Sequence, residues 1–210
     1  MVEMDLVAIQ PRSFRPRTTH SRHHLGYSPN RLLSEPPPDD INRIWVADIT
    51  YIPLKSGRFV YLALVMDLFS RRIVGWKLDD NMGASLVLAA LRRAITQRQP
   101  GADLVHHSDR GGQYAAGDYR QVLTRSHMRQ SMSRKSDCYD NTFMESCFGT
   151  IKRELEMTPY EHFPEALRSV VQYITYYNIS RRHSSIAYLS PAQLERQHAQ
   201  KKRKTLIQNR

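Results

Sequence analysis

The sequence predicts an α/β protein built on a mixed five-stranded sheet, an antiparallel meander followed by parallel strands, flanked by helices. Two observations support this fold class. Between residues 44 and 78, three runs rich in β-branched and aromatic residues follow one another with only short breaks. Further along, shorter apolar runs alternate with segments whose apolar residues recur at helical spacing, which is typical of a sheet covered by helices.

The first three strands form the meander. They are IWVADITYI (residues 44–52), FVYLALVMDLF (59–69) and RRIVGWKL (71–78). The breaks between them, Pro53 to Arg58 and Ser70-Arg71, are short enough for antiparallel hairpins. The run at 44–52 is apolar on both of its alternating faces, which predicts a central strand covered from both sides.

The later elements alternate between helix and strand. They are a helix at 83–97, a strand at 102–107, a turn at 109–112, a short helix at about 114–123, a strand at 128–133, and a helix that begins near Asp137 or Asp140 and ends near Leu155. A last long helix presents one apolar face, which consists of Phe163, Leu167, Val170, Val171, Ile174 and Tyr177.

We expect the chain to divide into four parts. Residues 1–40 contain six prolines and read as an extended N-terminal arm or linker. Residues 41–160 form the core, and 161–197 a C-terminal helical extension of it. Residues 198–210 form a basic tail, in which KKRK is followed by a terminal arginine.

Composition excludes several classes of protein. Apolar residues make up 40% and charged residues 24%, as in soluble globular domains. No apolar stretch approaches the roughly 18 residues that cross a bilayer, and the N-terminus lacks the pattern of a secretory signal. Two cysteines, Cys138 and Cys147, are too few for a disulfide framework. We therefore expect an intracellular protein.

The net charge of +11 favours a polyanionic partner such as nucleic acid, because cationic side chains displace counterions from phosphates. A merely basic soluble protein is the alternative. The distribution of charge favours phosphate contact, since two clusters contain no acid. They are the C-terminal run and the set Arg120, Arg125, Arg129, Arg134 and Lys135.

Three acids stand where carboxylates are unexpected. Asp48 lies in the middle of the predicted central strand, where an ionised group is costly unless it is paired or bound to a metal. Asp109 ends the fourth strand, at the edge where open α/β sheets bind ligands. Glu145 lies on the helix of DNTFMESCFGTIKRE, whose buried stripe should be Phe143, Met144, Phe148 and Ile151.

Each acid has a simpler interpretation. Asp48 could pair with an arginine, Asp109 could bond the backbone of its own turn, and Glu145 could simply be solvated. Together, however, a strand, a strand end and a flanking helix could bring three carboxylates to one place, which suits hard cations. Two Mg²⁺ ions about 3.5–4 Å apart serve phosphodiester chemistry. Lys152 follows Glu145 by two helical turns on the same face.

Five motifs in order resemble those of the second-frame transposases of the IS-three group of bacterial insertion sequences. They are WVADITYI, DLFSRRIVGW, HHSDRGGQY, SRKSDCYDNTFMESCFGTIKRE and YNISRRHSSIAYLSPAQ, which together span about residues 42–193. The resemblance implies a ribonuclease-H-like, integrase-like catalytic core. It also implies the catalytic and metal-binding triad Asp48, Asp109 and Glu145, with 35 residues between the last two.

The resemblance implies metal-dependent phosphodiester cleavage and strand transfer in DNA transposition, with two Mg²⁺ ions or Mn²⁺ as a substitute. Its partners would be element-end and target DNA, a second copy of the chain, and an upstream-frame helix-turn-helix protein or domain. The protein would act in the bacterial cytoplasm, on the nucleoid when bound to DNA. The predicted DNA contacts are Lys152, Arg110, Arg134, Lys135, Asn178, Arg181, Arg182 and His183.

Two alternatives remain open from sequence. The first is a truncated or non-catalytic DNA-binding fragment of a mobile element, since nothing before Asn42 resembles the helix-turn-helix region of the family. The second is a nuclease of the same fold, which would cut DNA without joining it.

Overall fold

A computed structural model of the chain describes residues 23–134, 142–155 and 159–208. Its strands are β1 (Ile44–Pro53), β2 (Phe59–Asp67), β3 (Ile73–Asp79), β4 (Val105–Ser108) and β5 (Arg129–Met132). Its helices are α1 (Ala84–Arg98), α2 (Gly112–Ala115), α3 (Gly117–Arg125), α4 (Thr142–Glu154), α5 (Phe163–Ile179), the 3₁₀ helix η3 (Ser184–Ile186) and α6 (Pro191–Gln208). No described helix is long and apolar enough to cross a membrane.

The five strands form one mixed sheet in the order β3-β2-β1-β4-β5. The pairs β1–β2 and β2–β3 are antiparallel, whereas β1–β4 and β4–β5 are parallel. This arrangement confirms the predicted meander followed by parallel strands. The predicted central strand is also confirmed, because β1 lies in the middle of the sheet.

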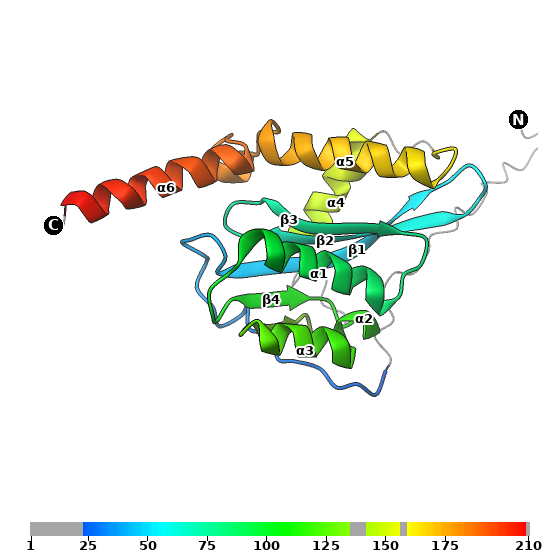
Figure 1. Ribbon diagram of the computed structural model, residues 1–210, viewed down its shortest axis with the longest axis horizontal. Helices are drawn as coiled ribbons and strands as arrows, with labels where there is room; N and C mark the ends of the chain where they lie inside the picture. The colour runs from blue at the N-terminus through cyan, green and yellow to red at the C-terminus, as the bar shows by residue number, and fades with distance from the viewer. Residues whose placement is uncertain (1–22, 135–141, 156–158, 209–210) are drawn as a thin grey trace, which may run out of the picture.

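Helices cover both faces of the sheet, so β1 is buried on both sides (Figure 1). Val46 and Ile52 belong to one apolar cluster, which α4 and α5 complete. Trp45 and Ala47 belong to a second cluster on the opposite face, which α1 and α3 complete. The alternation of β1 side chains therefore places Asp48 on the α4 side of the sheet.

Some elements differ from their predictions. The single short helix expected at 114–123 is two helices, α2 and α3, because Ala116 adopts an extended conformation between them. Val171 is 44% exposed rather than buried, so the apolar stripe of α5 is narrower than predicted. Asp137, Asp140 and Cys138 lie outside the described residues, and Cys147 is a free, buried thiol.

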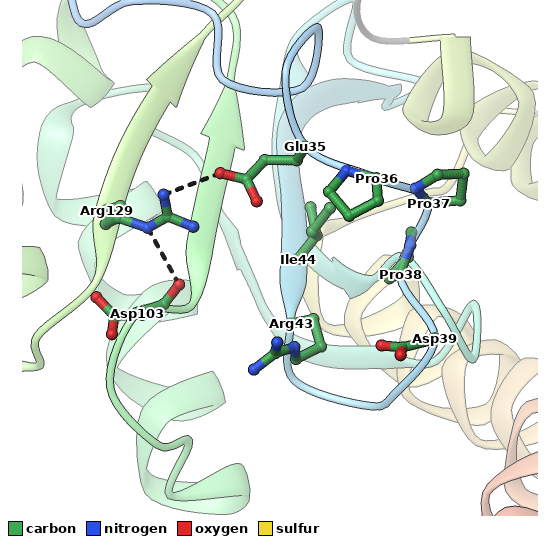
Figure 2. A pocket seen from close by; sticks show the side chains of 9 residues that line it. All are labelled: Glu35, Pro36, Pro37, Pro38, Asp39, Arg43, Ile44, Asp103 and Arg129. Atoms are coloured by element: carbon green, nitrogen blue, oxygen red, sulfur yellow. Dashed lines mark hydrogen bonds and ion pairs between the residues drawn. The ribbon is translucent and has the colours of Figure 1, made fainter.

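The part of the N-terminal segment that the structure describes packs against the core along β5. The Arg31 N–H donates to Ser131 Oγ at 2.9 Å, and Met132 N–H donates to the Pro29 carbonyl at 3.4 Å. Glu35 forms an ion pair with Arg129 at 2.9 Å (Figure 2). The segment thus covers the edge strand of the sheet, a position that otherwise exposes unpaired backbone groups.

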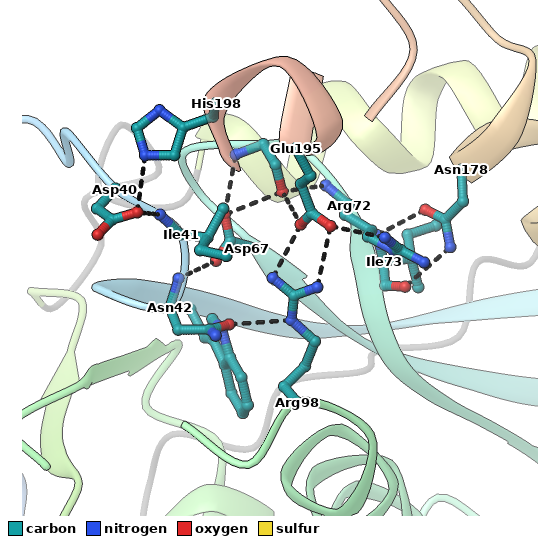
Figure 3. A network of polar contacts seen from close by, with 12 residues as sticks. Asp40, Ile41, Asn42, Asp67, Arg72, Ile73, Arg98, Asn178, Glu195 and His198 are labelled. Atoms are coloured by element: carbon teal, nitrogen blue, oxygen red, sulfur yellow. Dashed lines mark hydrogen bonds and ion pairs between the residues drawn. The ribbon is translucent and has the colours of Figure 1, made fainter. Parts of the chain in front are cut away.

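Helix α6 continues through residue 198, the predicted start of the basic tail. Its first turns are fixed to the core through Glu195, which pairs with Arg72 and Arg98 (Figure 3). Residues 199–208 are exposed, and Figure 1 shows this end of the helix projecting away from the sheet. The basic residues of the tail are therefore presented on a helix rather than on an extended chain.

A close approach of α1 to β3 depends on Gly75. A Cβ atom at this position would lie 2.3 Å from the Ala90 carbonyl oxygen and 2.7 Å from Ala94 Cβ. We expect Gly75→Ala to lower the free energy of unfolding by roughly 3 kcal/mol, which is the upper end of the typical loss when a core is overpacked. Urea denaturation measures this change. Gly101→Ala is the control, since nothing lies within 4 Å of its added Cβ, and an equal loss in both variants would contradict the explanation.

Candidate active site

Asp48 and Asp109 lie side by side because of the parallel pairing of β1 with β4. The register pairs Ala47 with Ser108, so the residues that follow occupy neighbouring positions. The Asp109 carboxylate accepts the Gly111 N–H at 2.9 Å, and the Asp48 carboxylate accepts the Ile49 N–H at 2.8 Å. The turn interaction considered for Asp109 therefore exists, and it holds the carboxylate at the end of β4.

The charges of three neighbouring side chains act on the pKa of Asp48. Burial raises the pKa of Asp48 well above 3.8, and the neighbouring charge of Asp109 raises it further. The Ile49 N–H opposes this rise, Glu145 adds to it, and Lys152 lowers the pKa. All three of the other predicted residues, Asp109, Glu145 and Lys152, therefore lie within electrostatic reach of Asp48.

Helix α4 carries Glu145 and Lys152 on the side that faces these acids. Glu145 is exposed in the first turn, and Lys152 is half-buried two turns later. The Lys152 ammonium lies 4.3 Å from the centre of the Tyr51 ring on β1. This cation–π contact fixes the lysine beside the strand that carries Asp48.

The prediction of the buried stripe of α4 is wrong for one residue. Met144, Phe148 and Ile151 are buried as predicted, but Phe143 is 39% exposed. The Arg71 guanidinium lies 4.6 Å from the centre of the Phe143 ring. Phe143 therefore lies at the surface, in contact with Arg71, and not in the core.

The acid cluster has the donors that a hard cation prefers, since carboxylate oxygens from β1 and β4 are adjacent. Mutual repulsion of these partly buried carboxylates is also what a bound cation would relieve. Among the described residues, no group of three or more acidic, histidine or cysteine side chains is close enough to hold an ion as it stands. Asp48 and Asp109 are the two described acids that the pairing of β1 with β4 brings together, and Glu145 is within electrostatic reach of Asp48.

A buried network supports the strand end that carries Asp109. His107 Nδ1 lies 2.8 Å from Ser131 Oγ, and His107 Nε2 lies 3.2 Å from Ser133 Oγ. Because Ser131 Oγ accepts from Arg31 N–H, its hydroxyl hydrogen is free to donate to Nδ1. Ser133 Oγ donates to the Ser108 carbonyl and is left to accept from His107 Nε2–H, so a ring proton is assigned to Nε2, and the ring joins β4 to β5.

The N-terminal segment also contacts the loop after Asp109, which sequence reasoning missed. His23 Nε2 lies 3.0 Å from the Arg110 carbonyl oxygen. The Arg110 guanidinium donates to the Ser133 carbonyl at 2.6 Å and lies 4.9 Å from the Tyr27 ring centre. The available signal was only the density of histidine and tyrosine before the core, which does not specify a partner.

Several of the predicted DNA contacts are engaged within the protein. The Asn178 side chain accepts the Ile73 N–H and donates to the Ile73 carbonyl, both at 2.9 Å, which leaves it a structural role on the edge of β3. Arg181 pairs with Glu154 at 2.7 Å, and His183 is half-buried. Sequence could not reveal these bonds, because their partners lie far away in the chain.

Other predicted cations remain on the surface. Arg134 and Arg182 are exposed, whereas Lys135 lies outside the described residues. Within the basic cluster, Arg129 pairs with Glu35, and Arg120 donates to the Gly26 carbonyl at 2.7 Å. Part of the charge that sequence assigned to phosphate contact therefore holds the N-terminal segment instead.

Comparison with solved structures shows the same fold. The HTLV-2 integrase catalytic core domain, solved in complex with magnesium, matches with a TM-score of 0.58 at 17% identity, over 73% of this chain and 96% of that one. A simian T-cell lymphotropic virus intasome chain matches with a TM-score of 0.62 at 16% identity, over 85% of this chain and 61% of that one. The ribonuclease-H-like fold is thereby confirmed.

Sequence relatives identify the family. Two models described as "Integrase core domain" match residues 38–138 and 126–191. The insertion element IS600 uncharacterized 31 kDa protein of Shigella sonnei is 42% identical over 90% of this chain and 70% of its own length.

Two curated transposases are comparably similar. The transposase for insertion sequence element IS904 of Lactococcus lactis is 41% identical over 74% of this chain, and transposase InsF for insertion sequence IS3A of Escherichia coli is 40% identical over 88%. The chain spans 62% and 64% of the lengths of these two proteins. It belongs to the family of insertion-sequence transposases that carry an integrase core domain.

Proposed function

We propose that this chain is a DNA transposase that cleaves DNA phosphodiester bonds and transfers the resulting strands. The observation that carries the proposal is the pair of adjacent carboxylates, Asp48 and Asp109, with Glu145 and Lys152 in electrostatic reach. Nothing in the sheet requires such a pair, because placing two repelling acids in a partly buried position is unfavourable. Its presence in an integrase core domain therefore supports a catalytic role.

Each residue has a distinct role in this proposal. Asp48 and Asp109 would hold divalent metal, and Glu145 would complete the site from α4. A pair of Mg²⁺ ions, or Mn²⁺ in their place, would activate the attacking oxygen and stabilise the leaving one. Lys152, held against Tyr51, contacts the phosphate backbone beside the acids. The attacking group is water or a DNA 3′-hydroxyl, so no covalent enzyme intermediate is required.

DNA would reach this site over a basic surface. Arg134 and Arg182 are exposed and would contact phosphates, and α6 presents the exposed Lys201, Arg203 and Lys204 beyond the core. A second copy of the chain would bring two DNA ends together, as the intasome in the comparison suggests for that viral assembly. An upstream helix-turn-helix protein or domain would recognise the sequence of the element ends, since phosphate contacts carry no sequence information.

A joining assay separates this function from the two alternatives. The protein is incubated with Mn²⁺, a supercoiled plasmid, and a fluorescent duplex that ends in a free 3′-hydroxyl. A transposase should attach the label covalently to the plasmid. Nicked plasmid without attached label would instead identify a nuclease. DNA binding in a gel-shift assay with neither product would identify a non-catalytic fragment, and either result would contradict the proposal.

A further inference from the structure

A pocket lies on the other flank of α4 from the acids. Its volume is about 280 Å³, and Ser146 and Thr150 line it from α4. These two residues are four apart and therefore lie on one side of the helix, whereas Glu145 and Lys152 lie on another. Among the residues that the structure describes, no acidic side chain lines this pocket. It is therefore separate from the acid cluster and opposite to it in charge.

Arg71 contributes a cation with an unused donor to this pocket. It lies in the turn between β2 and β3 with a φ of 63°, and its guanidinium rests on the exposed Phe143 ring. Its Nε is buried and has no hydrogen-bond partner in the described part of the chain. No carboxylate within the described residues lies at ion-pair distance from Arg71. The acid whose charge acts on Arg71 is Asp67, and the Asp67 carboxylate accepts the N–H groups of Asn42 and Ser70.

His183 contributes a second unused donor. Its Nδ1 lies 3.1 Å from the Arg181 guanidinium, which can only donate, so Nδ1 accepts and the ring proton is on Nε2. Nε2 is buried, and none of the described residues forms a hydrogen bond with it. Burial, followed by the charge of Arg181, lowers the pKa of His183 to about 4, so the ring is a neutral donor at pH 7. The ring packs edge-on against Tyr177 with centres 4.6 Å apart, which fixes its direction.

Two residues that line one pocket each have an unused buried donor, and such donors call for an acceptor, because each buried unsatisfied donor costs about 1–3 kcal/mol. The hydroxyls of Ser146, Thr150 and Ser185 add further donors around the same space. Water could satisfy the donors but could not neutralise the Arg71 charge. An oxyanion does both, and charge-assisted bonds to arginine are among the strongest in proteins.

We propose that this pocket binds a phosphate group of the DNA backbone, as a second DNA contact across α4 from the acids. The assignment of a phosphate rests on the donors and charge described above. The assignment of DNA as its source rests on the proposed function. One helix would then contact DNA along both flanks, with the acids on one side and a phosphate anchor on the other.

The test measures binding of a duplex of arbitrary sequence without metal, so that no cleavage takes place. Arg71→Gln should weaken binding roughly tenfold and reduce the slope of log affinity against log salt by about one. Arg71→Lys keeps the charge and should largely keep the slope, although both variants lose the planar stacking on Phe143. Arg92→Gln is the matched control. Arg92 is an exposed residue of α1, so this substitution removes the same charge from the opposite face of the sheet.

Inorganic phosphate provides the second measurement. Titration with phosphate should shift the NMR signal of the His183 ring N–H, which is assigned by its loss in His183→Gln. If Arg71→Gln binds DNA like Arg92→Gln while phosphate still shifts His183, the pocket binds free phosphate and the DNA assignment is wrong. If phosphate leaves His183 unchanged, the phosphate site itself is wrong. Neither result tests the catalytic proposal. Only the metal-dependent joining assay can contradict that proposal.

Discussion

Asp109→Asn should abolish metal-dependent DNA cleavage and joining while leaving the protein folded. Asparagine retains an oxygen that can accept the Gly111 N–H, so the turn after β4 should persist. It removes, however, one of the two adjacent anionic ligands of the proposed metal site. A loss of about 4 kcal/mol of transition-state stabilisation corresponds to a decrease on the order of 10³-fold in rate. The joining assay with labelled duplex measures this decrease.

Stability should change in the opposite direction from activity. Burial and the charge of Asp109 both disfavour the ionised form of Asp48, so neutralising Asp109 relieves repulsion in the metal-free protein. We therefore expect the Tm of Asp109→Asn without metal to equal or exceed that of the wild type. Mn²⁺ at a hundredfold excess over its Kd should stabilise the wild type by about 2.7 kcal/mol and the variant by much less.

Asp103→Asn is the matched control for this prediction. Asp103 lies just before β4, is exposed, and has a φ of 66°, a conformation that asparagine tolerates well. The variant removes the same charge at the opposite end of the same strand and should keep both activity and metal-dependent stabilisation. If Asp109→Asn matched Asp103→Asn in rate, the acid pair would not be the catalytic centre.

The sheet was predictable because its signals are local. The strongly apolar runs at β1, β2 and β3 identify strands, and short breaks between them permit only hairpins. Asp48 could be singled out because a carboxylate contradicts the environment that its strand predicts, and Asp109 because it ends a strand at the edge where such sheets bind ligands. A local conflict of this kind is expected at functional sites.

The contacts that hold the ends of the chain were not predictable in this way. Arg31 meets Ser131 across 100 residues, and Glu195 meets Arg98 across 97. No period or spacing in the sequence marks such a pair, because any of many arginines could have been the partner. The same limit explains Asn178, whose amide side chain gives no sign that it will bond the backbone of β3.

Glu195→Gln should cause one of the largest losses of stability available outside the sheet core. The Glu195 carboxylate pairs with Arg98 at 2.9 Å and with Arg72 at 2.6 Å, and it also accepts the Ser70 hydroxyl at 2.9 Å. Only about a tenth of the Glu195 and Arg98 side chains is exposed. Removing one partner of a buried pair leaves an uncompensated charge, and we expect a loss of about 3 kcal/mol. Urea denaturation measures it.

The dependence of this loss on pH identifies its cause. Burial alone would raise the pKa of Glu195, but Arg98 and Arg72 together lower it below 4.5. A lowered carboxyl pKa in the folded state contributes stability that is present above pH 4.5 and is lost as the pH falls through the folded pKa. The difference in unfolding free energy between wild type and Glu195→Gln should therefore be constant near neutral pH and shrink below about pH 4.5.

Glu161→Gln provides the comparison, because Glu161 also pairs with a cation, Lys55, but both side chains are more than half exposed. Exposed ion pairs contribute about 0–1 kcal/mol, so this variant should unfold almost like the wild type. Hydrogen exchange then locates the effect of Glu195→Gln. Because Glu195 joins α6 to the turn between β2 and β3 and to the end of α1, amides in the first turns of α6 should lose protection before those of β1. Equal loss of protection in α6 and β1 would show that the network supports the whole fold and not the attachment of this basic helix.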